Sequence, residues 1–171
     1  MAIFAPELLA WMRAHHDVAT SAVLLDHGIT VDQRRRLVAQ RVLVRIINGA
    51  YTFPGRETQP LTRCAALCLC HDDVVVGGPT AAALWELPGY SLGDEVSALA
   101  PPGRRPCAAD WLNLIHTEPP HRDEVVMRAD GINLTSPPRT TVDLARFVPP
   151  GRLEPLIERL LYGQGVDRET K

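Results

Sequence analysis

Residues 30–53 read TVDQRRRLVAQRVLVRIINGAYTF, and this stretch decides how the first third of the chain folds. Thr30 suits a helix N-cap, because its hydroxyl accepts from backbone N–H groups left unpaired in the first turn. The arginine-rich run after it has helical spacing, whereas Val42–Ile47 is a β-branched run. Asn48-Gly49 is the strongest two-residue signal for a type I′ turn, and Ala50–Phe53 returns as a second strand. The stretch therefore predicts a capped helix that runs almost directly into a β-hairpin.

Two shorter helices are predicted ahead of it. Residues 6–15 begin with a proline at a plausible first helical position and carry an apolar stripe that should bury Trp11. The Thr-Ser pair at 20–21 can cap a second helix, which ends at Gly28, a residue type suited to a left-handed C-terminal position. Two helices, a third rich in arginine and a hairpin follow one another in a winged helix-turn-helix. We therefore expect residues 1–55 to form a winged helix-turn-helix DNA-binding domain.

The third helix should have two faces. At 100° per residue, Val31, Leu37 and Val38 fall on one side and should face the core. The opposite side carries Asp32, Gln33, Arg36 and Gln40, with Arg35 at its border. Arg34 falls on the apolar side, where its methylenes can run over the core while the charge reaches the edge. An eleven-residue helix is about 16 Å long, and a major groove about 12 Å wide accepts one.

Residue types suggest roles on DNA. Arg36 suits guanine, whereas Gln33 and Gln40 suit adenine. Border and hairpin arginines position a protein without reading bases, so Arg41, Arg45 and Arg35 are assigned to phosphates. The predicted DNA-binding residues are Thr30, Gln33, Arg35, Arg36, Gln40, Arg41, Arg45 and Asn48. The competing interpretation is the solvated face of an ordinary helix, since charge-rich helix faces are common.

Composition sets the broad class of the protein. The chain has 171 residues, 46% of them hydrophobic, which is typical of a globular protein. The net charge of −2 hides an asymmetry, because residues 1–55 hold 6 arginines against 4 acidic residues. No apolar run approaches the about 18 residues of a membrane span, and the N-terminus lacks a signal-peptide pattern. We expect a soluble cytoplasmic protein that does not enter a membrane.

A second domain is predicted after a proline-rich segment at residues 54–60. Residues 61–171 show mixed helix and strand patterns, so the fold class expected for the whole chain is α+β, with a mixed α/β domain at 61–171. The predicted helices are 61–70, 79–87, 139–147 and 152–162. The predicted strands are 74–76, 95–100, 111–116, 124–127 and 132–134.

Three motifs in this second part were weighed for chemistry. Cys64, Cys68, Cys70 and the adjacent His71 lack a second, turn-spaced ligand pair, so buried reduced thiols are favoured over a metal site. Gly77-Gly78-Pro79 matches neither a P-loop nor a dinucleotide fingerprint and predicts a tight strand-to-helix turn. Arg139 and Asp143, four residues apart, predict an ion pair. We expect no cofactor, no metal and no catalytic residue.

Three segments, in this order, resemble the AbiEi-type antitoxin family of bacterial type IV toxin–antitoxin systems. They are Gly49-Ala50-Tyr51, GPTAAALWELP at residues 78–88 and TSPPRTTVDLAR at residues 135–146. The likeness covers nearly the whole chain and extends to related actinobacterial proteins. It implies an N-terminal winged helix-turn-helix on operator DNA and a C-terminal antitoxin domain acting against a nucleotidyltransferase-like toxin. Arg34 departs from the family at a position that is usually apolar, and Arg41 stands where glycine commonly ends the recognition helix.

The predicted function is that of a DNA-binding antitoxin and transcriptional autorepressor. Its predicted partners are double-stranded operator DNA, the cognate toxin and, as an open possibility, a second copy in a homodimer. One alternative is the N-terminal DNA-binding part of a longer nuclease-like protein, because this region precedes a nuclease-like domain in many actinobacterial relatives. A second alternative is an enzyme, either a nuclease or a phosphotransferase. Both activities generally need a positioned lysine, and the only lysine of the sequence is Lys171. A third hypothesis is a protein-interaction module, in which the C-terminal domain contacts the toxin.

Overall fold

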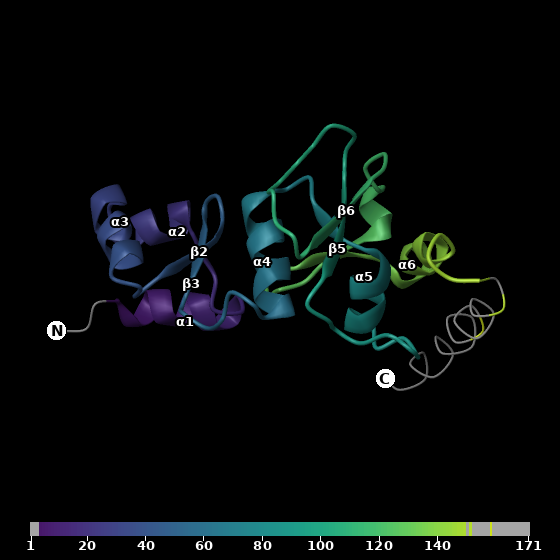
Figure 1. The fold of residues 1–171 in the computed structure, drawn as a ribbon, viewed down its shortest axis with the longest axis horizontal. Helices are drawn as coiled ribbons and strands as arrows, with labels where there is room; N and C mark the ends of the chain where they lie inside the picture. The colour runs from purple at the N-terminus through teal and green to yellow at the C-terminus, as the bar shows by residue number, and fades with distance from the viewer. Residues whose placement is uncertain (1–3, 150, 152–157, 159–171) are drawn as a thin grey trace, which may run out of the picture.

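Helices and strands alternate along the chain in the order α1–β1–α2–α3–β2–β3, followed by α4–β4–α5–β5–β6–η1–β7–β8–α6. This computed structural model describes residues 4–149, 151 and 158. Helices α1, α2 and α3 gather with a small sheet at one end, and α4, α5 and α6 surround a larger sheet at the other (Figure 1). The predicted α+β class is confirmed. Among the residues described, none of the helices has the length and apolar character that a membrane span requires.

Three helices enclose the first hydrophobic core, namely α1 (Pro6–Ala14), α2 (Ser21–Asp26) and α3 (Val31–Ala39). Leu8 and Met12 lie one helical turn apart on α1 and are both fully buried. Trp11 is only half-buried, and its ring stacks on that of His15 with centroids 3.8 Å apart. The prediction that α1 buries Trp11 is therefore wrong, because the face that carries Leu8 and Met12 inward leaves Trp11 at the rim.

The start and end signals of α2 behave as predicted. Thr20 is the N-cap, and its hydroxyl accepts from the backbone N–H of Val23 at 3.3 Å. Gly28 follows the helix with a φ of +80°, in the left-handed region that glycine tolerates without strain. The chain turns there and enters α3 through Thr30.

The hairpin consists of β2 (Val44–Ile47) and β3 (Ala50–Thr52), and β1 (Ala19–Thr20) adds to it in the order β1-β3-β2. All pairs are antiparallel. A type I′ turn needs a positive φ at both central residues, but only Gly49 has one, at +90°. The predicted turn type is therefore wrong. The strand register also shifts between Arg45 and Ile47, which marks a bulge beside the turn.

A five-stranded mixed sheet forms the second part, in the order β6-β5-β4-β8-β7. Its strands are β4 (Val75–Val76), β5 (Val96–Ala100), β6 (Leu112–His116), β7 (Val125–Met127) and β8 (Asn133–Thr135). The helices of this part are α4 (Pro60–Cys70), the 3-10 turn η1 (Arg122–Glu124), α5 (Gly78–Leu84) and α6 (Pro137–Leu144). All four strands predicted after residue 90 are present, and the strand predicted at 74–76 is β4.

Two helices differ from the prediction at both ends: α5 is Gly78–Leu84 in place of 79–87, and α6 is Pro137–Leu144 in place of 139–147. The helix predicted to reach residue 87 ends at Leu84, because Glu86 takes a left-handed φ of 54° and the N–H of Leu87 bonds back to the carbonyl of Ala82. Helix α6 begins at Pro137, two residues earlier than predicted, since prolines are well tolerated in a first helical turn. The helix predicted at 152–162 lies outside the described residues.

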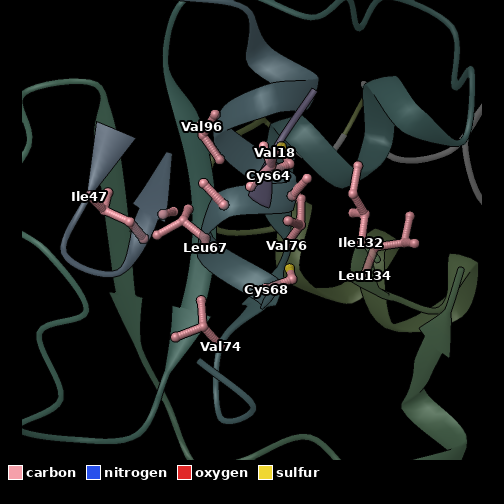
Figure 2. Close-up of a cluster of buried hydrophobic side chains, with 14 of the residues drawn as sticks. Val18, Ile47, Cys64, Leu67, Cys68, Val74, Val76, Val96, Ile132 and Leu134 are labelled. Carbon is pink, nitrogen blue, oxygen red and sulfur yellow. The ribbon is translucent and has the colours of Figure 1, made fainter. Parts of the chain in front are cut away.

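One large core connects the two parts of the molecule. It joins Val18, which precedes β1, and Ile47 and Ala50 of the hairpin to α4 and to the five-stranded sheet. Figure 2 shows Ile47 of the hairpin directed towards Leu67 of α4, with Val76 and Leu134 of the larger sheet further along the same cluster. The division into domains 1–55 and 61–171 remains a prediction. Helix α4 packs against residues of both predicted domains.

Candidate nucleic-acid interface

Helix α3 begins with a reciprocal capping box. The hydroxyl of Thr30 accepts from the N–H of Gln33 at 3.3 Å, and Oε1 of Gln33 accepts from the N–H of Thr30 at 2.8 Å. The predicted cap is therefore confirmed. A bidentate contact with adenine needs both Oε1 and Nε2 of a glutamine, and the cap already occupies one of them. Of the two glutamines, Gln40 keeps both groups available, because it lies past the helix end and is exposed.

The exposed face of α3 differs in one place from the predicted face. Leu37 is buried and Val38 is half-buried, as expected, but Val31 is 46% exposed. The prediction that Val31 faces the core is wrong: Val31 is the first residue of α3 and lies two turns from Val38, which has nearly the same direction on the helix but is half-buried. The exposed residues of α3 are Val31, Asp32, Gln33, Arg35, Arg36 and Ala39.

The three consecutive arginines have three different environments. Arg34 is half-buried, and its guanidinium lies over the ring of Tyr51, 5.2 Å from the centroid. Arg35 makes a 3.4 Å contact with Asp32 between two highly exposed side chains, which contributes little in water. Arg36 is exposed, and its guanidinium has neither a hydrogen bond nor an ion pair with the described part of the chain. Arg36 is thus the arginine whose charge is fully open to a polyanion.

Arg41 closes α3 in a conformation that glycine usually takes. Its φ is 55°, and its N–H bonds to the carbonyl of Val38 at 3.0 Å. The N–H of Val42 bonds to the carbonyl of Leu37 at 2.9 Å, which completes a Schellman motif. A side chain in the left-handed region costs about 1 kcal/mol. The arginine is exposed, so nothing in its packing offsets that cost.

The hairpin residues of the predicted site are held by α4. Arg45 and Asn48 are exposed, and Arg45 pairs in register with Tyr51. A Cβ added to Gly49 would lie 3.5 Å from Sγ of Cys70, so the turn of the hairpin lies close to the end of α4. Arg45 and Asn48 therefore lie on a braced hairpin, on the same part of the molecule as α3.

A depression of about 360 Å³ lies beside α3 and includes residues that were not predicted. It is lined by His27, Gly28, Ile29, Gln33, Arg36, Leu37 and Gln40. Three of the predicted DNA-binding residues therefore share one surface feature, namely Gln33, Arg36 and Gln40. His27 is the residue that sequence reasoning missed. Its only signal was its place in the turn between α2 and α3.

A second depression, of about 430 Å³, lies between η1 and α6. The predicted ion pair is confirmed there, since Nε of Arg139 lies 3.1 Å from Asp143, and Nη1 lies 2.9 Å from Glu124. The backbone N–H of His121 and then the Arg139 guanidinium hold the pKa of Glu124 below its usual range. Because Arg139 pairs with Asp143 of its own helix and with Glu124 of η1, the cluster joins α6 to η1.

The cysteines are free thiols. Cys64 and Cys68 are buried, and Cys70 and Cys107 are half-buried. Burial raises the pKa of Cys68 to about 11, so this thiol stays protonated at neutral pH. Within the described residues no three metal-binding side chains come together. Gly78, with a φ of +53°, forms the tight strand-to-helix turn predicted at residues 77–79.

Comparison with known proteins supports the fold alone. No protein-family model matches the chain, and no curated protein matches it. A similar solved structure is that of the RV2827C protein from Mycobacterium tuberculosis, with a TM-score of 0.52 and 16% sequence identity. The likeness covers 89% of this chain and 70% of that one, so the two arrangements are similar over both parts of the molecule described above.

Proposed function

We propose that the chain is a winged helix-turn-helix protein that binds double-stranded operator DNA with α3 and the β2–β3 hairpin. Four exposed arginines lie on these elements and on the turn that joins them, namely Arg35, Arg36, Arg41 and Arg45. The observation that carries the proposal is Arg36, an exposed cation on α3 that is unpaired within the described chain. Arginine in a major groove gives the commonest specific contact to DNA, through guanine O6 and N7.

The test is binding to the DNA upstream of the protein's own gene. Fluorescence anisotropy with labelled duplexes should give tight binding that weakens steeply as salt increases, because bound arginines release counterions. Arg36→Ala should lose discrimination between this duplex and random DNA, by about 10- to 100-fold. Arg13→Ala is the matched control, since Arg13 is also exposed but lies on α1. Equal binding of the wild type and Arg36→Ala would remove α3 from the interface.

We further propose that the protein is an antitoxin that represses its own operon and neutralises a nucleotidyltransferase-like toxin. The support is the resemblance of residues 49–51, 78–88 and 135–146 to the AbiEi-type antitoxins. Co-expression with a neighbouring nucleotidyltransferase gene should restore growth to cells that the toxin alone arrests. Failure of rescue with well-folded protein would contradict the antitoxin part and leave DNA binding intact.

Point substitutions separate the two activities better than truncation. Removing residues 1–55 would expose the α4 face that packs on Val18, Ile47 and Ala50, because these residues share the large core. Arg36→Ala changes only an exposed side chain. If Arg36→Ala abolishes operator binding and still rescues growth, repression and neutralisation lie on different surfaces.

A further inference from the structure

The depression beside α3 combines apolar and cationic side chains. Ile29 and Leu37 are buried and apolar, whereas His27 and Arg36 carry N–H groups. A nucleotide backbone unit has the same two parts, an apolar deoxyribose and an anionic phosphate. The depression adjoins the face of α3 that we assign to the major groove. A DNA strand at the edge of the major groove would present its deoxyribose to the apolar side chains and its phosphate to the N–H groups.

The imidazole of His27 has a fixed tautomer when it is neutral. Its Nδ1 lies 2.8 Å from the carbonyl oxygen of Val23, and a carbonyl oxygen only accepts. Nδ1 therefore carries the hydrogen, and Nε2 of the neutral ring holds a lone pair. A phosphate oxygen also accepts only, so it cannot bond to Nε2 of the neutral ring. His27 can donate to a phosphate only as the imidazolium, in which both ring nitrogens carry hydrogens.

The charges around the depression favour an anion. Of the residues that line it, only His27 and Arg36 can carry charge. Asp26 precedes His27 on α2 and is exposed, and Asp32 on α3 is in contact with Arg35. An anion in the depression is therefore attracted by the charge of Arg36 and is not repelled by any residue of the lining. A bound phosphate would in turn favour the protonated form of His27.

We infer that this depression binds one sugar–phosphate unit of the DNA backbone, with the His27 imidazolium donating through Nε2 to the phosphate. The deoxyribose lies against Ile29 and Leu37, and Arg36 adds its charge beside the phosphate. The inference rests on the proposed DNA-binding function. It adds a contact to the DNA backbone by a residue outside the predicted set, and this contact forms only with the imidazolium form of His27.

The experiment uses the full chain and a duplex selected by it from a random-sequence library. Single phosphates of that duplex are replaced one at a time by uncharged methylphosphonates, and affinity is measured at about pH 6 and about pH 8. One substituted position should lower wild-type affinity about tenfold at the lower pH and much less at the higher pH. In His27→Gln the loss at that position should be the same at both pH values, because Arg36 stays charged at each of them while the imidazolium is absent.

His116→Gln is the matched control. Nδ1 of His116 also contacts a backbone carbonyl, that of Pro101 at 3.2 Å, but on β6 in the other part of the molecule. It should behave as the wild type. The inference is overturned if no position shows a pH-dependent loss with the wild-type protein, which needs no variant to fold, or if His27→Gln keeps that loss. Failure to select any duplex would instead overturn the proposed function and the inference with it.

Discussion

The guanidinium of Arg34 lies over the ring of Tyr51, 5.2 Å from its centroid, and this contact holds an arginine on the core side of α3. Tyr51 belongs to β3 and is itself buried in the first core. A cation over an aromatic face contributes about 0.5–2 kcal/mol, more when the pair is shielded from water. The contact ties α3 to the hairpin, which are the two elements proposed to bind DNA together.

Arg34→Gln should therefore destabilise the protein. We expect a loss of about 0.5–2 kcal/mol in the free energy of unfolding, measured by urea denaturation, because the cation–π contact and the methylenes over the core are both affected. Arg35→Gln is the control, since Arg35 is its neighbour on the helix and has a highly exposed side chain. It should change stability by less than about 0.5 kcal/mol. Equal effects of the two substitutions would mean that the contact with Tyr51 stabilises nothing.

Arg41→Gly should stabilise the fold and weaken DNA binding. Glycine removes the cost of a left-handed φ at the end of α3, so the free energy of unfolding should rise by up to about 1 kcal/mol. The same change deletes an arginine assigned to a phosphate, which should reduce the slope of log affinity against log salt by about 0.9. Arg41→Asn, a residue type that tolerates the left-handed region, should give the same loss in binding. Unchanged affinity and salt slope would show that Arg41 does not contact DNA.

Arg45→Ala should weaken binding to all duplexes by a similar factor. Arg45 is exposed on β2 and is assigned to a phosphate, so its loss should not change sequence preference. Anisotropy titrations with the operator and with random DNA should fall together, in contrast to the selective loss expected for Arg36→Ala. A loss confined to the operator would instead assign Arg45 to a base.

The sequence predicted the local structure correctly where a residue type has one physical role in that structure. Thr20 and Thr30 cap helices because their hydroxyls reach unpaired N–H groups, and both caps are present. The pattern failed where tertiary packing decides. Trp11 is displaced to a rim by Leu8 and Met12, and Val31 lies outside the contact made by Leu37.

The candidate site was predictable only in part for the same reason. The arginine positions follow from a helix wheel, but the tautomer of His27 depends on a carbonyl that only the folded α2 places beside it. The hairpin packs on α4 through contacts between residues on opposite sides of the 54–60 segment. No local sequence pattern predicts such contacts.

Gly77→Ala should destabilise the larger sheet. A Cβ at residue 77 would lie 2.8 Å from Cγ of Leu99, a fully buried side chain of β5, so the core must shift to accept it. Overpacking of this kind costs about 1–3 kcal/mol. Gly93→Ala is the control, because nothing lies within 4 Å of a Cβ added there. Thermal unfolding should show a lower midpoint for Gly77→Ala alone, and equal midpoints would mean that Leu99 yields without cost.

Asp130 should make the stability of the protein sensitive to acid. Its carboxylate lies 2.6 Å from Nη2 of Arg128 and 3.0 Å from Nε2 of His16, which joins the turn after α1 to the turn between β7 and β8. Burial raises the pKa of Asp130, but the hydrogen bonds from Arg128 and His16 outweigh it and hold that pKa below its usual range. A depressed carboxyl pKa contributes stability above the pKa of the unfolded chain, and that stability is lost as pH falls through the folded value.

Asp130→Asn tests this linkage. It should cost about 1–3 kcal/mol at neutral pH, because the hydrogen bonds from Arg128 and His16 lose their carboxylate. It should also flatten the fall in the free energy of unfolding below about pH 4, where the unfolded wild-type chain binds a proton at Asp130 that the folded chain does not yet bind. Asp123→Asn is the control, since Asp123 is an exposed aspartate on η1. If the two variants follow the same curve from neutral pH into acid, the contact between His16 and Asp130 does not hold the two parts of the molecule together.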